Sequence, residues 1–253
     1  MRSIEILGVR VDDVTYAESV ALVERFIGER GPHLVVTPNP EIVMLARRDP
    51  EFRAVLGRAA LAVPDGVGLL WAARLRGRPL REHVRGTDLV YRLAQRSAER
   101  SWRWYLLGAA EGVAEAAGAA LVRRYPGLSV VGAAAGSPRP SDDPEVRRLV
   151  AAAGPVDLIL VAYGAGAQER WLDRNLGPLD IPVGIGVGGV LNYLSGRTRR
   201  APGWMRALEL EFLHRLLTQP WRWRRQLALP HFALLAAREA IHARIAGGGR
   251  PDV

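Results

Sequence analysis

The chain has 253 residues, of which 49% are hydrophobic, so it can bury a large core and does not have the composition of a disordered protein. It contains neither cysteine nor lysine, which excludes disulfides, a thiolate nucleophile, Schiff-base catalysis and a Walker-type phosphate loop. Arginine therefore carries the formal charge of +9, and residues 197–253 hold 11 arginines against 4 acidic residues, or +7 of that total.

Short β-rich runs alternate with helical patterns through most of the chain. The expected strands, in chain order, are HLVVT (33–37), ALAVP (60–64), WRWYLL (102–107), LSVVGA (128–133), DLILVAY (157–163) and IPVGIGV (181–187). Runs such as DLILVA do not alternate with polar residues, as expected for strands that helices cover on both faces. The sequence therefore predicts an α/β fold, with a Rossmann-like, mainly parallel sheet between two layers of helices.

Capping signals place three of the helices. Thr15 and Glu18 form a capping box that opens an amphipathic helix, Thr87 is expected to cap a helix that runs to about Arg100, and an alanine-rich helix is expected over 111–124. The adjacent pairs Asp12-Asp13 and Asp142-Asp143 are interpreted as solvated loop or cap residues, because no Asp-x-Asp spacing accompanies them.

The pattern changes after Gly196, where strand-like runs stop and Arg/Trp-rich helical segments begin. We therefore predict an α/β domain over 1–196 and a basic helical appendage over 197–253. An apolar stripe at three- and four-residue spacing predicts that the first appendage helix is amphipathic; its members are Met205, Leu208, Phe212 and Leu216.

Ligands of an open parallel sheet bind outside the carboxyl ends of its strands, so the residues that follow each expected strand are the candidate site. Thr37 and Asn39 follow the first strand, where they either cap the next helix or bind a substrate. Asp65 follows the second strand with Gly66 behind it, and it is either a helix cap or a general base for an attacking hydroxyl.

The segments after the later expected strands contain a charged side chain and two glycine-rich loops. Arg85 beside the start of the next helix is either a phosphate contact or part of a capped helix. Glycine-rich loops follow the last two expected strands, over 163–169 and 184–189, but neither has the GxGxxG spacing of a dinucleotide site. Without an Asp-x-Asp pair or a metal-binding histidine motif, we expect no metal and no cofactor, and a diphosphate would be met by arginine and helix N-termini.

The appendage contains the cluster WRWRR at 221–225. Tryptophan at a lipid–water boundary and arginine near anionic headgroups favour adhesion to an anionic membrane surface. Nucleic-acid binding is the competing interpretation, and we rank it lower because the same segment carries an apolar stripe and no nucleic-acid motif.

The segments TPNPE, PDGVG, VRGTDL, YLLG, YGAGAQE, GVGG and SGRTRRAPGWMRALELEFLHRLLTQPWR, in this order, resemble the WecG/TagA/CpsF glycosyltransferase family. The resemblance covers nearly the whole chain. It implies an inverting, metal-independent transfer from a UDP-activated amino sugar, such as N-acetylmannosamine, or a uronic acid. The acceptor would be undecaprenyl-diphosphate-linked N-acetylglucosamine or a similar lipid-linked sugar, in the synthesis of teichoic acid or another cell-surface polysaccharide.

By the same resemblance Asp65 is the catalytic base, whereas the family usually has arginine where this chain has His83. The expected substrate contacts are Thr37, Asn39, Gly66, His83, Arg85, Asp88, Gly108, Gly164, Gln168, Glu169, Gly186 and Arg200. The expected contacts to the lipid diphosphate or the membrane are Arg215, Arg222, Arg224, Arg225, Trp221 and Trp223.

No apolar run approaches the roughly 20 residues that span a bilayer, so we expect a cytoplasmic protein held peripherally on the inner face of the plasma membrane. Two other functions stay open: a non-catalytic relative that binds sugar nucleotides or lipids, and another nucleotide-binding α/β enzyme. The sequence does not distinguish a monomer from a homo-oligomer.

Overall fold

The structure is a computed structural model, and it describes residues 1–218 and 228–247. Its centre is a six-stranded parallel sheet with the order β4-β3-β8-β7-β5-β6. The strands are β3 (His33–Val36), β4 (Leu61–Ala62), β5 (Arg103–Gly108), β6 (Ser129–Ala134), β7 (Leu158–Ala162) and β8 (Val183–Gly186). All six expected strands are present, and the predicted α/β fold is confirmed.

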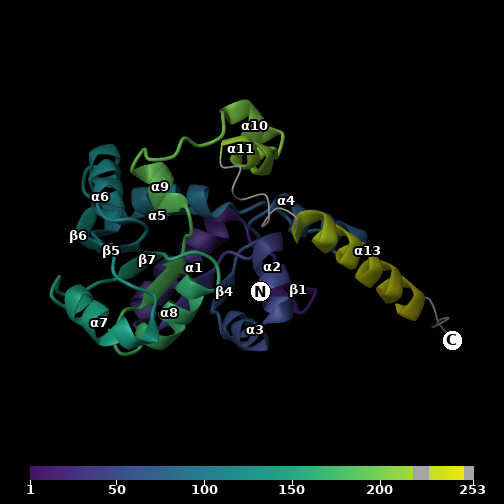
Figure 1. Cartoon of the computed structure of the whole chain (residues 1–253), viewed down its shortest axis with the longest axis horizontal. Coiled ribbons are helices and arrows are strands. Elements are labelled where there is room, and N and C mark those ends of the chain that lie inside the picture. Colours follow the sequence, from purple (N-terminus) through teal and green to yellow (C-terminus); the bar gives the residue numbers. More distant parts are fainter. Residues whose placement is uncertain (219–227, 248–253) are drawn as a thin grey trace.

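Helices cover both faces of this sheet (Figure 1). Successive side chains of a strand point to opposite faces, and here both sets are buried, as with Leu160 and Val161 of β7. One face carries α1 (Tyr16–Glu29), α5 (Gly86–Arg100), α6 (Val113–Arg124) and α9 (Val190–Leu194). The other carries α2 (Pro40–Arg48), α3 (Pro50–Gly57), α4 (Val67–Leu75), α7 (Asp143–Ala151) and α8 (Ala167–Asn175). A short 3-10 helix, η1 (Pro140–Asp142), precedes α7.

Two helix starts differ from their predicted positions. The capping box of Thr15 and Glu18 is present at α1. However, α5 already begins at Gly86 after an extended Arg85, so Thr87 lies inside the first turn instead of capping it. The alanine-rich helix α6 begins at Val113, because Gly112 in the left-handed conformation ends the preceding turn.

An N-terminal hairpin that the sequence did not predict packs beside α3 and α4, formed by β1 (Ser3–Ile6) and β2 (Val9–Asp12). Its two-residue turn places Leu7 and Gly8 at positive φ. Asp12 is only 2% exposed and its carboxylate accepts the backbone N–H of Ala62 at 2.8 Å. The predicted solvated character of Asp12 is therefore wrong, and burial raises the pKa of this carboxyl group.

Asp13 and Asp143 are also less exposed than predicted, whereas Asp142 is partly exposed and is the N-cap of α7, as the cap interpretation predicts. Asp13 is 8% exposed and accepts the backbone N–H of Arg81 at 2.9 Å. Asp143 is 6% exposed and pairs with Arg174 at 2.8 Å. Burial of a carboxylate needs such partners, and here they come from segments distant in the chain, which a local sequence pattern does not reveal.

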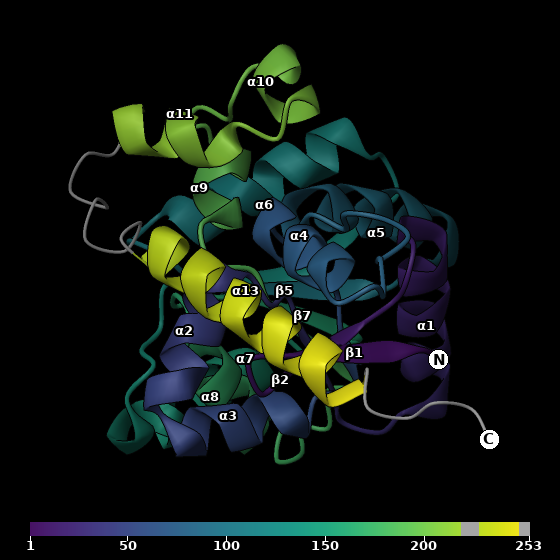
Figure 2. The ribbon, with the colours of Figure 1, turned by 90° about the vertical axis from the view of Figure 1, so that its right-hand side faces the viewer.

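The described part of the chain after residue 196 forms helices α10 (Gly203–Ala207), α11 (Glu211–Thr218) and α13 (Ala228–Gly247). Helices α10 and α11 stand apart at the top of Figure 1, while α13 lies against α2 and α4, as Figure 2 shows. Phe232, Ala236 and Ala240 of α13 are buried at four-residue spacing. None of the helices in 1–218 and 228–247 is both long and apolar enough to cross a membrane.

The predicted amphipathic helix that would join Met205 to Leu216 is not continuous. The chain leaves the helical conformation between α10 and α11, where Glu209 has a φ of 61°. Met205 is 8% exposed, whereas Leu208 is 63% exposed, so the stripe does not form one buried face.

Candidate active site

Asp65 lies in a short loop (residues 63–66, here the Asp65 loop) between β4 and α4. The N-cap of α4 is Gly66, and no side chain caps this helix. Asp65 is therefore not a helix cap, which removes the competing interpretation of this carboxylate. Its side chain is 30% exposed, and its backbone N–H donates to the carbonyl of Pro38 at 3.0 Å. That bond ties the loop after β4 to the loop after β3.

The two candidates after β3 differ in what they do. Asn39 is the N-cap of α2, and its side chain accepts the backbone N–H of Ile42 at 3.0 Å, so the capping interpretation holds for it. Thr37 caps nothing: its hydroxyl donates to the carbonyl of Gly186, at the end of β8, over 3.4 Å. Thr37 therefore connects the ends of two neighbouring strands, β3 and β8.

Gly86 brings the base candidate and this threonine together. A Cβ at Gly86 would lie 3.4 Å from Asp65 Oδ2 and 3.4 Å from Thr37 Cγ2, which is ordinary van der Waals contact. Gly86, the first residue of α5, thus lies beside both side chains, and a helix N-terminus favours negative charge near it. Asp65, Thr37 and Gly86 form one cluster at the carboxyl edge of the sheet, as the sequence predicted for the first two.

His83 and Arg85 are in the loop between α4 and α5 (residues 76–85) and approach the same cluster. His83 Nε2 accepts the backbone N–H of Gly66 at 2.7 Å and lies 3.7 Å from Asp65 Oδ1. Its other ring nitrogen, Nδ1, lies 2.8 Å from Glu209 Oε2. Arg85 donates to Glu209 Oε1 at 2.5 Å and to the carbonyl of Arg206 at 2.9 Å. Glu209 was not predicted as a site residue, because nothing in its local sequence distinguishes it from a surface glutamate.

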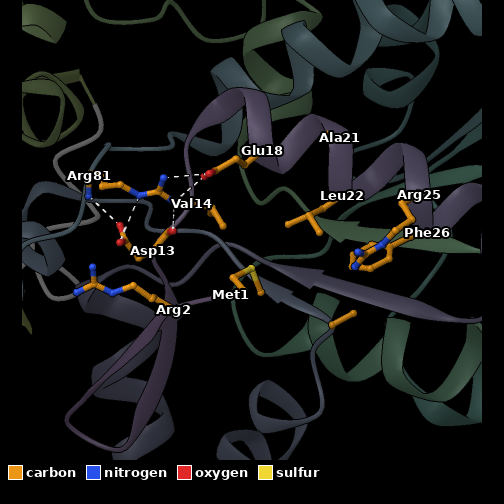
Figure 3. A pocket seen from close by; sticks show the side chains of 11 residues that line it. Met1, Arg2, Asp13, Val14, Glu18, Ala21, Leu22, Arg25, Phe26 and Arg81 are labelled. Carbon is orange, nitrogen blue, oxygen red and sulfur yellow. Dashed lines mark hydrogen bonds and ion pairs between the residues drawn. The ribbon is translucent and has the colours of Figure 1, made fainter.

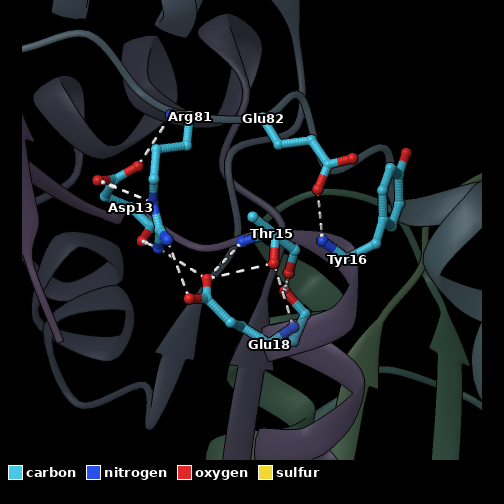
Figure 4. Close-up of polar contacts among 7 residues, drawn as sticks. Asp13, Thr15, Tyr16, Glu18, Arg81 and Glu82 are labelled. Carbon is cyan, nitrogen blue, oxygen red and sulfur yellow. Dashed lines mark hydrogen bonds and ion pairs between the residues drawn. The ribbon is translucent and has the colours of Figure 1, made fainter.

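The opposite side of the α4–α5 loop is anchored to the start of α1 (Figure 4). Arg81 pairs with Glu18 at 2.7 Å and with Asp13 at 3.3 Å, while Glu82 accepts the backbone N–H of Tyr16 at 2.8 Å. The hydroxyl of Tyr16 accepts the backbone N–H of Arg85 at 2.8 Å, and burial raises the pKa of Tyr16 to about 12. These contacts fix the loop on which His83 and Arg85 are carried.

Figure 3 shows a cavity beside this anchor, between the N-terminal residues and α1. Arg81, Asp13 and Glu18 line it at one end, and Phe26 lines it at the other. None of the predicted site residues lines this cavity. It is therefore separate from the cluster around Asp65.

Gln168 and Glu169 at the start of α8 are more buried than a pair of substrate-contacting side chains need be. Gln168 is 2% exposed; its amide oxygen accepts the backbone N–H of Gly188 at 2.9 Å, and its amide nitrogen donates to Glu169 at 2.8 Å. Glu169 is fully buried and accepts the backbone N–H of Gly166 at 2.7 Å, and burial raises its pKa. The two side chains thus hold the glycine loops after β7 and β8 together.

Three glycines of those loops border open space. A Cβ at Gly164, Gly188 or Gly189 would meet no heavy atom within 4 Å. Gly186 is the opposite case, because its Cβ would lie 2.7 Å from the amide nitrogen of Gln168. The carboxyl edge of β7 and β8 therefore combines a tightly packed floor with backbone that a ligand can approach.

The remaining predicted contacts are Gly108, at the end of β5, and the pair that Asp88, at the start of α5, forms with Arg200. Gly108 ends β5, where its Cβ would lie 2.8 Å from the backbone of Ala162, so it serves close packing between β5 and β7. Asp88 pairs with Arg200 at 2.6 Å. Burial opposes ionisation of Asp88, but the hydrogen bond and charge of Arg200 outweigh it and lower the pKa of this carboxyl group. Arg200 Nε and one terminal nitrogen are buried without a hydrogen-bond partner among the described residues.

The predicted membrane contacts cannot be placed in the same way. Trp221, Arg222, Trp223, Arg224 and Arg225 lie outside the described residues. Arg215 falls within α11, but its side chain is also outside what the structure describes. Among residues 1–218 and 228–247, no three His, Asp or Glu side chains are grouped so that they could hold a metal ion.

The chain thus has an α/β fold in which a carboxylate, a threonine and the first residue of a helix lie together at the carboxyl edge of a parallel sheet. Comparison with known proteins identifies the protein family. The model of the glycosyl transferase WecG/TagA/CpsF family matches residues 4–246, so the chain belongs to this family and is a glycosyltransferase.

Three relatives illustrate the relationship, each named an N-acetylglucosaminyldiphosphoundecaprenol N-acetyl-beta-D-mannosaminyltransferase. The protein of Bacillus spizizenii is 34% identical over 198 residues, which is 78% of this chain and 76% of the relative. The Bacillus subtilis protein is 31% identical over 218 residues, which is 86% of this chain and 84% of the relative. The Staphylococcus aureus protein is 30% identical over 237 residues, which is 93% of this chain and 92% of the relative.

Proposed function

We propose that this glycosyltransferase moves a sugar from a UDP-sugar donor to a polyprenyl-diphosphate-linked N-acetylglucosamine, with inversion and with Asp65 as general base. N-acetylmannosamine or a related amino sugar or uronic acid is the proposed cargo, and a cell-surface polysaccharide is the proposed product. The names of the three relatives support the acceptor and the sugar. The observation that carries the proposal is the carboxylate of Asp65, which caps no helix and lies beside Thr37 and the first residue of α5.

In the proposed reaction the acceptor hydroxyl oxygen attacks C1 of the donor sugar. Asp65 accepts the hydroxyl proton as the new glycosidic bond forms. The bond between C1 and the β-phosphate oxygen breaks at the same time, and UDP leaves with that electron pair. Attack from the face opposite the leaving group inverts the configuration at C1.

Positive groups near the cluster suit the leaving diphosphate. The N-terminus of α5 bears partial positive charge, and Arg85 lies at its N-cap. Arg200 is joined to the same helix through Asp88 and keeps two nitrogens without partners among the described residues. Donors that are already oriented stabilise charge as it develops on the departing group, without a metal ion taking part in the proposed step.

The backbone on the other side of the cluster suits the sugar. Gly164, Gly188 and Gly189 border open space at the ends of β7 and β8, so a ring could approach their backbone closely. Gln168 fixes the second of these loops through Gly188. We therefore assign Gln168, Glu169 and Gly186 to shaping the sugar pocket and not to direct contact with the sugar.

The test of this function is acceptor-dependent release of UDP, measured with a panel of UDP-sugars and a short-chain polyprenyl-diphosphate-linked N-acetylglucosamine. Loss of a general base costs about 10²- to 10⁴-fold in rate, so Asp65→Asn is expected to fall by that factor with the preferred donor. Glu99→Gln is the matched control, because Glu99 forms a surface ion pair with Arg96 away from the site. Equal rates in Asp65→Asn and the wild type would refute the assignment of the base.

We also propose that the enzyme works as a peripheral protein on the inner face of the plasma membrane, where a polyprenyl-linked acceptor resides. Support comes from large apolar side chains that the described helices leave exposed. Trp204 is 62% exposed, Leu208 63% and Leu217 71%, all on or beside α10 and α11. Exposed tryptophan and leucine next to a basic segment are suited to the boundary between lipid and water.

A further inference from the structure

Glu209 joins the appendage to the loop that approaches the catalytic base. It stands between α10 and α11, 126 residues after His83 in the chain, and its two carboxylate oxygens have different partners. Oε2 lies 2.8 Å from His83 Nδ1, and Oε1 accepts from Arg85 at 2.5 Å. The proposed reaction gives this carboxylate no part.

The backbone at Glu209 has a conformation that glycine adopts at lower cost. Glu209 N–H donates to the carbonyl of Arg206 and Leu210 N–H donates to that of Met205, which is the hydrogen-bond pattern of a Schellman motif at the end of α10. The residue at the left-handed position of this motif is usually glycine. Glu209 occupies it with a φ of 61°, so the sequence keeps a carboxylate where the backbone favours no side chain.

The contacts of His83 define which ring nitrogen carries the proton. A backbone N–H can only donate, so the 2.7 Å bond from Gly66 requires that Nε2 is an unprotonated acceptor. The proton of the neutral ring is then on Nδ1, from which it is donated to Glu209. The carboxylate of Glu209 selects this tautomer through Oε2, while its other oxygen is held by Arg85 at 2.5 Å.

The selected tautomer matters because Nε2 is also 3.7 Å from Asp65 Oδ1. With the proton on Nε2, the ring would oppose the Gly66 N–H and donate toward Asp65, occupying a lone pair that the base needs. With the proton on Nδ1, the ring holds the Asp65 loop through Gly66 and leaves the carboxylate of Asp65 free. His83 therefore supports the base only while Nδ1 has an acceptor.

We propose that Glu209 is a positioning residue of the active site, which fixes the tautomer and ring orientation of His83 and through it the Asp65 loop. The inference rests on the proposed role of Asp65 in catalysis. It links the segment after α10 to the base across the α4–α5 loop.

Two substitutions separate this role from a structural one. Glu209→Gly removes the carboxylate and suits the left-handed backbone, so relief of backbone strain offsets part of the lost contacts with Arg85 and His83 and the variant is expected to fold. Glu209→Gln keeps an oxygen that accepts from Nδ1, and it serves as the conservative rescue. The tautomer of His83 is read from its ¹⁵N chemical shifts in the full chain, with the signal assigned by its loss in His83→Gln.

For the wild type and Glu209→Gln we expect the Nδ1–H tautomer, and for Glu209→Gly a mixture of the two. In metal sites the loss of a contact that orients a histidine typically costs 10- to 100-fold, and by that analogy kcat of Glu209→Gly is expected to fall roughly tenfold with KM nearly unchanged. Glu209→Gln is expected to stay within about threefold of the wild type, since the acceptor remains.

The proposal is overturned if Glu209→Gly keeps the wild-type tautomer and kcat, or if Glu209→Gln loses as much activity as Glu209→Gly. Failure of the proposed function gives a different result. In that case Asp65→Asn is as active as the wild type, while the tautomer of His83 still responds to Glu209→Gly. A tautomer that does not respond, in an enzyme that Asp65→Asn inactivates, refutes the positioning role alone.

Discussion

Gly186 and Gln168 form a packing pair at the end of β8 whose energetic coupling can be predicted from the structure. An added Cβ at Gly186 would lie 2.7 Å from Gln168 Nε2 and 3.0 Å from its Cδ and Cγ. Gln168 is 2% exposed and bonded at both ends of its amide, so it has no free direction in which to move. Gly186→Ala must therefore displace this side chain.

The expected cost can be worked from these contacts. Overpacking of a tight interior costs about 1–3 kcal/mol, and loss of one buried hydrogen bond of Gln168 adds about 1 kcal/mol. Replacement of a strand glycine by alanine returns about 0.5–1 kcal/mol through the unfolded chain. We expect Gly186→Ala to lower the free energy of unfolding by about 2 kcal/mol, as the balance of these effects.

Urea unfolding followed by circular dichroism measures this change, and Gly189→Ala is the matched control. A Cβ at Gly189 meets no heavy atom within 4 Å and the residue has a φ of −78°, so the control is expected to change stability by less than about 1 kcal/mol. In a Gln168→Ala background Gly186→Ala should cost at least about 1 kcal/mol less than in the wild type, since the obstructing amide is gone. Equal costs in both backgrounds would refute the clash.

Two further predictions concern acid stability and the membrane. Burial of Asp157 opposes its ionisation, but the hydrogen bonds and charge of Arg103 outweigh it and lower the pKa of Asp157 in the folded state. At pH values above 3.8, the ordinary pKa of this group, the ionised carboxylate of Asp157 therefore stabilises the folded state. This stabilisation is lost as the pH falls below that value. Asp157→Asn should destabilise the protein at pH 7 and weaken the pH dependence of unfolding between pH values of about 5 and 2, and an unchanged acid profile would contradict this. Trp204→Ala combined with Leu208→Ala should reduce co-sedimentation with vesicles of phosphatidylglycerol, with the exposed but polar Glu99→Gln as control, and equal co-sedimentation would exclude these side chains from the membrane contact. Point substitutions are preferable to truncation, because α13 buries Phe232 against the domain and its removal would expose part of the core.

Sequence alone determined the strands of the main sheet and the positions at which chemistry is expected. Runs such as that of β7 are apolar at every residue, a pattern that fits few structures besides a strand covered on both faces. The placement of Thr37 and Asp65 at one edge followed from the rule that parallel strands bring their carboxyl ends together. The hairpin β1–β2 was not predicted, since its turn, Leu7-Gly8, lacks a strong turn signal.

Only the tertiary structure decided what each polar side chain does. Asn39 and Asp65 both follow strands and precede helices, yet Asn39 caps its helix while Gly66 takes that place beside Asp65 and leaves the carboxylate free. Gln168, which the family resemblance gives as a substrate contact, is buried against Gly186 and bonded to the loop after β8. The side chains of Glu209 and His83 are in contact although the two residues are 126 positions apart in the sequence. Local sequence encodes the periodicity and caps of single elements, whereas these roles depend on which distant backbone N–H or charge the fold brings within hydrogen-bond distance.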